Sequence, residues 1–311
     1  MYCFLNGEMV DKDIKNLRIE NRGFTFSDGL FEVIRILEGK TLFLPDHFKR
    51  MQESAKFFNL NLAFSEEDCL NQVNTLIREN DLDDGEVYIE LSRGDDEFRE
   101  HSFSERHEGT FTVLTLPLRH INPDNWKNGV KLTLYPDLRH QLCEHKTVNL
   151  LTNCMAKNFA YSNGAYDSMM FRSSDSSSSA FKKAKFHNDF KVDEFNGENY
   201  DNKYITEGGS STYFLVKDGV VLTPEIDNIL PGITRKKVIK LCMENGIPIV
   251  ERRVFLEELK DADEVFLAST VSKVMPVREV RGKGYEVPGT VTKKLMEKFE
   301  ELIREELSEV K

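Results

Sequence analysis

The chain has 311 residues, a formal net charge of -11 and a charged fraction of 31%, which suits a globular protein of two domains. This acidic balance argues against nucleic-acid binding, which needs a clustered basic face. No apolar run approaches the roughly 20 residues of a membrane span, and the N-terminus "MYCFLNGEMV" lacks the basic segment and apolar core of a signal peptide.

Cysteine usage is typical of a reducing compartment. The five cysteines are odd in number, scattered along the chain and never spaced as a CxxC pair. We therefore expect free thiols in a cytoplasmic protein that has neither disulfides nor a bound metal.

The first 44 residues predict short strands joined by turns. Asn6-Gly7 lies between two apolar stretches, which is the strongest short-range signal of a β-hairpin. Glu38-Gly39 interrupts the apolar stretch "LFEVIRILEGKTLFL" in the same way.

Two amphipathic helices and two strands are expected next. Pro45 and Asp46 open the first helix, which continues through "HFKRMQESAKFF" with apolar residues at helical spacing. Ser65 is a candidate N-cap of the second helix, with Asp68 three residues later. The stretches "EVYIELSRG" and "GTFTVLTLPL" are typical of buried strands.

The second half of the chain alternates predicted strands and helices around one irregular segment. The strand "VKLTLYPDL", a helix ending near Ser162 and the strand "AYDSMMFRS" come first. Residues 173–203 are serine-rich and then charged without a period, which indicates a surface insertion. A hairpin around Asp218-Gly219, a helix in "TRKKVIKLCMEN", strands in "IPIVERRV" and "ADEVFLAST", and a charged helix over 290–311 follow.

The polar, turn-rich stretch "RHINPDNWKNG" is interpreted as the connection between two domains. We expect a mixed α+β chain with a small N-terminal domain over 1–117, a linker over 118–126 and a larger C-terminal domain over 127–311.

Two short motifs could bind an anion. In "LPGITRKKVIKL" a glycine precedes Ile233 and Thr234 at the start of a helix, where backbone N–H groups are exposed. "FLAST" ends a buried strand in two small hydroxyl residues, Ser269 and Thr270. Taken singly, each is better explained as an ordinary helix start or a polar strand end.

Three charged residues could carry chemistry. Arg50 follows His47 by one helical turn on the same face and could clamp a phosphate. Glu207 stands at a strand end before a "GGSS" turn, where a buried carboxylate needs a cationic partner such as a protonated pyridine nitrogen. Lys146, in "LCEHKTVNLLTN", precedes an apolar run that predicts the start of a helix. Each of them alone could also be a surface charge.

A phosphate site, an acid for a ring nitrogen and a lysine amine are together what pyridoxal 5′-phosphate (PLP) requires. The sequence resembles the fold-type IV, class IV PLP-dependent aminotransferases. The resemblance rests on "NRGFTFSDGLFEVIR", "LPDHFKRM", "EHKTVNLLTNCMAKN", "YITEGGSSTYF", "LPGITR" and "ADEVFLASTVSKVMPV". These stretches occur in family order and cover nearly the whole chain apart from the insertion.

The resemblance implies a two-domain fold with PLP in the interdomain cleft and a homodimer in which a partner loop completes each site. Lys146 would bind the cofactor covalently and then move a proton between the substrate and cofactor carbons. Glu207 would pair with the pyridine nitrogen and keep it protonated. The phosphate would be held by Arg50, Thr234, Thr270 and the backbone N–H of Ile233, with Ser269 nearby.

The family contains branched-chain L-aminotransferases, D-amino acid aminotransferases and aminodeoxychorismate lyases. The branched-chain enzymes carry Tyr-x-Arg on one strand, whereas this chain has "YIE" from Tyr88 and lacks the arginine. The D-amino acid enzymes carry an Arg-x-His that traps the substrate carboxylate, and Arg99 and His101 match it one residue further along than usual. The same loop, "DDEFREH", could equally be a solvated charged loop.

Phe31 departs from the D-amino acid pattern. Those enzymes have a carboxylate-binding tyrosine in "DGxYE", and Phe31 occupies that position without a hydroxyl. Carboxylate binding is therefore expected to be weaker or differently arranged. Leu150 and Leu151 stand where the branched-chain enzymes carry a tyrosine after the lysine.

These features together predict a ping-pong aminotransferase of D-amino acid or branched-chain type, acting on an amino acid and a 2-oxo acid. A lyase that uses the same lysine to eliminate pyruvate is the alternative. A non-catalytic homologue is a second alternative, against which the presence of Lys146, Glu207 and Arg50 argues.

Overall fold

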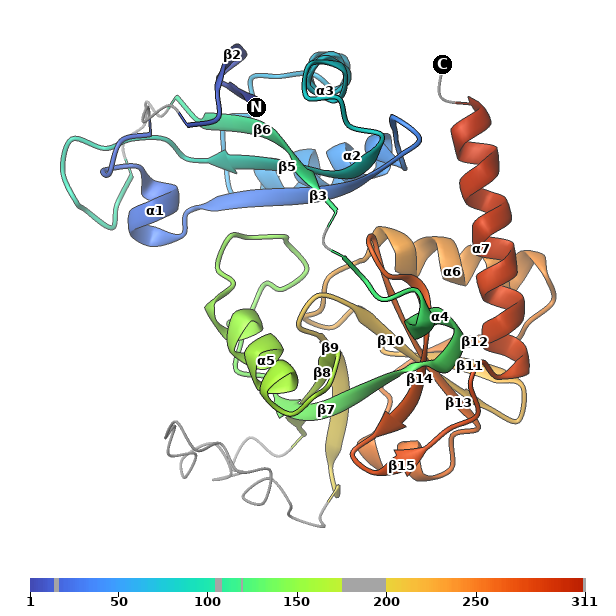
Figure 1. Cartoon of the computed structure of the whole chain (residues 1–311). Helices are drawn as coiled ribbons and strands as arrows, with labels where there is room; N and C mark the ends of the chain where they lie inside the picture. The colour runs from blue at the N-terminus through green and yellow to red at the C-terminus, as the bar shows by residue number, and fades with distance from the viewer. Residues whose placement is uncertain (14–16, 104–107, 119, 175–199, 310–311) are drawn as a thin grey trace. The chain divides into compact units, whose positions relative to one another are not determined.

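The computed structural model describes residues 1–13, 17–103, 108–118, 120–174 and 200–309 (Figure 1). The described chain divides into two compact units. The first unit comprises residues 1–121, 145–150 and 300–311, and the second comprises 122–144 and 151–299. Lys146 thus belongs to the first unit, although the predicted C-terminal domain over 127–311 contained it. Most of the predicted insertion over 173–203 lies outside the described residues.

The first unit is built on a six-stranded antiparallel sheet in the order β2-β1-β6-β5-β3-β4. Its strands are β1 (Tyr2–Leu5), β2 (Glu8–Asp11), β3 (Gly29–Leu37), β4 (Lys40–Thr41), β5 (Asp84–Ser92) and β6 (Thr110–Pro117). Both predicted hairpins are confirmed. Asn6 and Gly7 have φ values of 50° and 85°, and this left-handed pair matches the right-handed twist of the flanking strands.

Two helices, α2 (Leu44–Phe57) and α3 (Glu66–Glu79), pack on one face of this sheet (Figure 1). The predicted capping of α3 is confirmed, because the Asp68 backbone N–H donates to the Ser65 hydroxyl at 3.1 Å and the Ser65 N–H donates back to the Asp68 carboxylate at 2.9 Å.

A short helix, α1 (Arg22–Phe26), corrects the expectation of only strands and turns in the first 44 residues. The Asn21 side chain caps α1 by accepting the Gly23 N–H at 2.9 Å. A helix of five residues is too short to show an apolar period, so the pattern along the sequence did not reveal it.

Side chains along β3 alternate between the two faces of the sheet. Leu30, Ile34 and Ile36 join the buried core beneath α2 and α3, and Glu32 shares their face because it contacts residues of α2. Phe31 points to the opposite face, where Glu90 is its partner in the neighbouring strand β5. The face opposite the helices therefore carries the side chains that the sequence associates with substrate binding.

The Lys146 segment adds to the free edge of β3 instead of forming a helix. Thr147 forms an antiparallel bridge with Leu30, and the Val148 N–H donates to the Gly29 carbonyl at 3.0 Å. The predicted helix therefore begins later, at Leu151, which is a correction. The pairing with β3 overrides the local helical tendency of "TVNLL" because it satisfies the backbone groups of the segment.

The second unit is a nine-stranded mixed sheet in the order β12-β11-β10-β13-β14-β7-β8-β9, with β15 paired to β14. Its strands are β7 (Val130–Pro136), β8 (Asp167–Ser173), β9 (Lys203–Gly208), β10 (Thr212–Lys217), β11 (Val220–Thr223), β12 (Ile249–Glu251), β13 (Glu264–Ser269), β14 (Lys273–Val280) and β15 (Lys283–Gly284). Its helices are α4 (Asp124–Asn128), α5 (Leu151–Ser162), α6 (Ile233–Glu244), the 3-10 helix η3 (Leu256–Lys260) and α7 (Thr290–Glu309), whose last residues belong to the first unit.

This sheet curls, because strands that are distant in its order meet at one end. A turn from Gly208 to Ser211 links β9 directly to β10, and the Gly208 N–H donates to the Ser211 carbonyl at 2.6 Å. The predicted hairpin around Asp218 and Gly219 is confirmed between β10 and β11. The curl brings the ends of β9, β10 and β13 to the same region.

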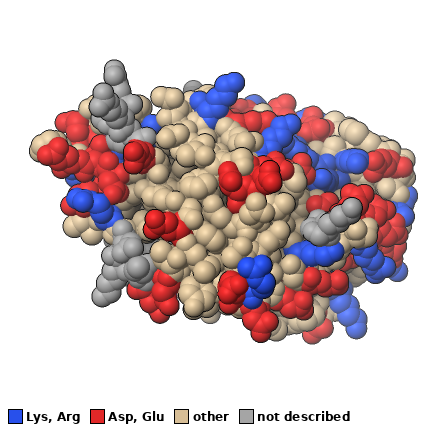
Figure 2. All heavy atoms as spheres, turned by 90° about the horizontal axis from the view of Figure 1, so that it is seen from above, with Lys and Arg blue, Asp and Glu red and all other residues tan. Residues whose placement is uncertain are grey.

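On the face that Figure 2 shows, lysine and arginine side chains lie among acidic ones around a broad uncharged area. Among the described residues, no helix is both long enough and apolar enough to cross a membrane.

Candidate active site

Lys146 projects over an aromatic ring of the first unit. Its Nζ lies 4.2 Å from the centroid of the Phe31 ring, and the Phe31 N–H donates to the Lys146 carbonyl at 2.9 Å. An ammonium above an aromatic face is attracted by the negative ring face. Both the backbone and the side chain of Lys146 are therefore held by Phe31, on the face of the sheet opposite α2 and α3.

Tyr88 and Glu90 lie on the same face as Phe31. The Tyr88 ring stacks on the Phe31 ring with centroids 5.7 Å apart, and the Tyr88 hydroxyl donates to Glu90 Oε2 at 2.5 Å. Burial raises the pKa of Tyr88, and Glu90 raises it further, so the hydroxyl keeps its proton. A carboxylate thus occupies the place where the branched-chain enzymes would carry an arginine.

Arg50 binds a carboxylate that sequence reasoning missed. Arg50 Nε and Nη2 donate to Glu32 at 2.8 and 2.7 Å, and His47 Nδ1 lies 2.7 Å from the same carboxylate. Burial opposes the ionisation of Glu32, but the charge of Arg50 and the hydrogen bonds from both partners lower its pKa to about 2. The signal for Glu32 was an acidic residue at a core position of the apolar strand "LFEVIRIL".

His145, the residue before Lys146, holds the backbone of this segment against α2. His145 Nδ1 lies 3.0 Å from the Ser54 hydroxyl, and the His145 ring stacks on Phe57 with centroids 4.3 Å apart. Phe58 meets the same ring edge-on at 4.9 Å. Residues at the end of α2 thus anchor the segment that carries the lysine.

Arg99 and His101 lie in the loop between β5 and β6 and share one aromatic neighbour. The Arg99 guanidinium lies 4.7 Å from the centroid of the Phe26 ring, and the His101 ring lies 5.3 Å from the same centroid. The structure therefore brings these two predicted substrate residues together against Phe26, the last residue of α1. They belong to the same unit as Lys146 and Phe31.

Glu207 is buried near the end of β9 in the second unit. Its carboxylate accepts a hydrogen bond from Arg139, and the Leu230 N–H lies 3.3 Å from both of its oxygens. Burial raises the pKa of Glu207, although Arg139 and the Leu230 N–H act in the opposite direction. A further cation beside this carboxylate would favour its ionised form.

Arg139 is a second residue that the sequence analysis missed. It donates to both oxygens of Asp137, from Nε at 2.9 Å and from Nη2 at 2.8 Å, while its Nη1 reaches Glu207. Arg172 also pairs with Asp137, at 3.1 Å. The signal was the D-x-R of "YPDLRH" directly after a strand, which places an arginine with its own counter-ion beside the sheet end.

The predicted phosphate ligands of the second unit gather at one end of its sheet. Ile233 and Thr234 open α6 after the N-cap Gly232, which has no side chain to bind the first N–H groups of the helix. A Cβ on Gly232 would lie 3.4 Å from the Thr212 hydroxyl, and Thr212 pairs with Ala268. The next two residues are Ser269 and Thr270, and the Ser272 N–H donates to the Ser269 hydroxyl at 3.1 Å.

These side chains fit the predicted cofactor by their chemistry. The second unit offers outward N–H groups at a helix start and hydroxyls, which suit a phosphate, and a buried carboxylate that suits a protonated ring nitrogen. The first unit offers a lysine amine, which suits an aldehyde carbon. Among the described residues, no group of three or more His, Cys, Asp or Glu could hold a metal ion.

Comparison with known proteins identifies the family. The chain matches the family model of the class IV amino-transferases over residues 29–180 and 199–280. It is 32% identical to the D-alanine aminotransferase of Bacillus licheniformis, over 94% of this chain and 94% of that protein. The branched-chain amino acid aminotransferase of Escherichia coli has a similar structure, with a TM-score of 0.80 at 24% identity, over 97% of this chain and 94% of that one.

A putative 4-amino-4-deoxychorismate lyase from Legionella pneumophila is also similar, with a TM-score of 0.74 at 25% identity, over 95% of this chain and 97% of that one. The predicted family, the mixed fold and the dependence on PLP are confirmed by these comparisons. Because the family model spans more than half of the sequence and a relative above 30% identity spans nearly all of it, this chain belongs to the class IV aminotransferases and is a PLP-dependent aminotransferase.

Proposed function

We propose that this enzyme transfers the amino group of a D-amino acid to a 2-oxo acid, and that it works as a homodimer in the cytoplasm. The observation that carries the substrate proposal is the 32% identity with a D-alanine aminotransferase over nearly the full length of both chains. The Tyr88–Glu90 pair supports it, because an acidic group stands where the branched-chain enzymes would have an arginine.

The proposed cofactor ligands come from the side chains described above in the first unit and in the second unit. Lys146 binds PLP covalently, and Glu207 pairs with the ring nitrogen while Arg139 holds the Glu207 carboxylate in place. The phosphate ligands are Arg50, the backbone N–H of Ile233, Thr234 and Thr270, with Ser269 nearby. When it is bound, PLP withdraws electrons from the substrate carbon that carries the amine.

The residues of the chain supply the proton transfer and the orientation. Lys146, released from PLP when the substrate amine takes its place, would accept the proton from the substrate Cα and pass it to the cofactor carbon, while the Phe31 ring keeps this amine on one face of the sheet. A single proton carrier fixed on one side gives stereochemical selectivity, since only one enantiomer then presents its Cα–H to the amine.

Arg99 and His101 bind the substrate carboxylate in this proposal. A guanidinium fork matches the two oxygens of a carboxylate. Because Phe31 has no hydroxyl, it donates no hydrogen bond to the substrate carboxylate. Binding of this carboxylate therefore depends on Arg99 and His101.

The test is the visible absorbance of the purified protein with PLP while D-alanine, L-alanine and L-leucine are added separately. We expect D-alanine to discharge the lysine-bound cofactor band and L-alanine, its mirror image, to leave it unchanged. Discharge by L-leucine alone would reassign the enzyme to the branched-chain type. If none of the three amino acids discharges the cofactor band and the protein releases pyruvate from aminodeoxychorismate, the enzyme is a lyase.

A further inference from the structure

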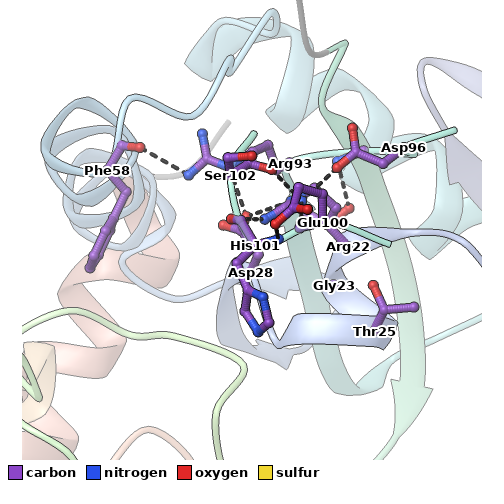
Figure 3. Close-up of polar contacts among 12 residues, drawn as sticks. Arg22, Gly23, Thr25, Asp28, Phe58, Arg93, Asp96, Glu100, His101 and Ser102 are labelled. Carbon is purple, nitrogen blue, oxygen red and sulfur yellow. Dashed lines mark hydrogen bonds and ion pairs between the residues drawn. The ribbon is translucent and has the colours of Figure 1, made fainter. Parts of the chain in front are cut away.

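Arg22 lies almost fully buried at the start of α1 and has no role in the reaction proposed above. It binds the main chain of the loop that carries the substrate residues (Figure 3). Its Nη1 donates to the carbonyl of Glu100 at 2.8 Å and reaches that of Ser102 at 3.4 Å, and its Nη2 donates to the carbonyl of His101 at 3.1 Å. One guanidinium thus holds three consecutive carbonyl groups.

Two carboxylates also bind the Arg22 guanidinium. Its Nε donates to Asp28 at 3.0 Å, and its Nη1 donates to Asp96 at 2.5 Å. Burial opposes the ionisation of Asp28, but hydrogen bonds from Arg93 and Arg22 lower its pKa, so it stays ionised near neutral pH. The orientation of the Arg22 fork is therefore determined before any substrate arrives.

Arg93 extends this network to the end of α2. It donates to Asp28 at 2.7 Å and to the carbonyls of Phe58 and Asn59 at 3.1 Å each (Figure 3). Phe58 also packs on His145, the residue before Lys146. The loop and the Lys146 segment are thus attached to the same helix end.

Phe26, four residues after Arg22 on α1, contacts the two side chains that are proposed to bind the carboxylate. Its ring centroid lies 4.6 Å from the Arg22 guanidinium, 4.7 Å from that of Arg99 and 5.3 Å from the His101 ring. The short helix α1 therefore holds the loop in two ways. Arg22 binds the backbone carbonyls of the loop, and Phe26 contacts the side chains of Arg99 and His101.

We propose that Arg22 is a positioning residue that, together with Phe26, sets the geometry of the substrate-carboxylate site at Arg99 and His101. The inference rests on the proposed function. A carboxylate clamp depends on accurate placement of its donors. The flat fork of arginine reaches three carbonyls at once, whereas the single ammonium of lysine cannot span them.

The test compares three variants of the holoenzyme with the wild type. Arg22→Lys keeps the charge but loses the fork, and Phe26→Leu removes the ring while leaving the ion pairs. Arg18→Gln is the matched control, because Arg18 lies nearby with 64% of its side chain exposed and forms long ion pairs with Glu20 at 3.5 Å and with the loop residue Asp95 at 3.7 Å, without binding the carbonyls of residues 100–102. The measurements are the PLP absorbance band, the kcat and KM for the amino donor, and amide hydrogen exchange over residues 95–103.

We expect Arg22→Lys and Phe26→Leu to raise the KM for the amino donor about tenfold or more, with a smaller change in kcat and an unchanged PLP band. Hydrogen exchange over residues 95–103 should become faster in Arg22→Lys, and Arg18→Gln should match the wild type throughout. Phe26→Leu keeps the test decisive if Arg22→Lys does not fold, because it leaves the buried charges paired.

Two results would overturn the inference about Arg22, and a third would overturn the proposed function on which it rests. Faster exchange of the loop with an unchanged KM would show that Arg22 orders the loop without serving the substrate. A parallel loss of the PLP band and of activity would indicate a general structural role. A wild-type protein that binds PLP but transfers no amino group would instead refute the proposed function, and the role of Arg22 with it.

Discussion

Glu32 of β3 and Arg50 of α2 form a bidentate ion pair inside the first unit, with Nε–Oε1 and Nη2–Oε2 distances of 2.8 and 2.7 Å. Both side chains are almost fully buried, and His47 binds the same carboxylate. The charge of Lys146 is among the influences that lower the pKa of His47, after burial. The arginine proposed to bind the PLP phosphate is thus oriented by a strand residue before the cofactor binds.

Replacing Glu32 should destabilise the protein in a pH-dependent way. The folded-state pKa of about 2 lies below the ordinary value of 4.5, so the stabilisation is fully present above pH 4.5 and is lost as the pH falls toward 2. Glu32→Gln should therefore lower the free energy of unfolding at pH 7 by roughly 3 kcal/mol. Denaturant unfolding between pH 2 and 7 measures this, and an equal loss for Glu32→Gln at both ends of that range would contradict it.

Lys146→Ala should abolish turnover while the protein still binds PLP non-covalently. The reason is that the lysine amine is the proposed covalent and proton-transferring group, whereas the phosphate ligands stay intact. Absorbance spectra and an aminotransferase assay measure the two effects. Lys49→Ala, which changes an exposed lysine on α2, should behave as the wild type. Wild-type turnover by Lys146→Ala would remove the lysine from the mechanism.

Arg99→Ala should raise the KM for the amino donor by about ten- to a hundredfold and leave PLP binding unchanged. A charged hydrogen bond to a carboxylate contributes roughly 1.5–3 kcal/mol. Steady-state kinetics and a PLP titration separate the two effects. Arg78→Ala is the control, since the Arg78 side chain is 70% exposed and pairs with its neighbour Glu79. Equal effects on substrate and PLP would exclude Arg99 from the carboxylate site.

Arg139→Gln should destabilise the second unit because it leaves the buried carboxylate of Glu207 without its cation. Removing one partner of a buried pair costs about 3–5 kcal/mol, and Asp137 keeps Arg172 as a partner at 3.1 Å. The double variant Arg139→Gln/Glu207→Gln should recover part of this loss, because the stranded charge is gone. Thermal unfolding of the single and double variants forms the cycle, and strictly additive losses would show that the two residues are not coupled.

Ser65→Ala should cost about 1 kcal/mol of stability and leave activity unchanged. The Ser65 hydroxyl accepts the Asp68 N–H in the capping box of α3, and this interaction is local and exposed. Chemical denaturation measures the loss. Ser65→Asn supplies another capping oxygen and should restore most of the stability, whereas identical losses in both variants would exclude capping as the cause.

The sequence determined the features that depend on neighbours along the chain. The turn at Asn6-Gly7 needs only residues that accept left-handed backbone angles, and the start of α3 needs only Ser65 and Asp68. The family motifs likewise identified the PLP-dependent aminotransferase, because several ordered stretches agree over most of the chain. Turns, helix caps and ordered family motifs can all be predicted from the sequence, because each depends only on residues that are close together or in a fixed order along the chain.

Tertiary structure decided the partners of the charged residues and the conformation of the Lys146 segment. Glu32 and Arg50 are 18 residues apart, Arg139 and Glu207 are 68 apart, and Arg22 and Glu100 are 78 apart. The "TVNLL" stretch has a helical pattern, but pairing with the edge of β3 determined its extended form. A buried charge must find its counter-ion wherever the folded chain places one, and backbone groups pair with the strand that lies beside them, so neither outcome follows from spacing along the sequence.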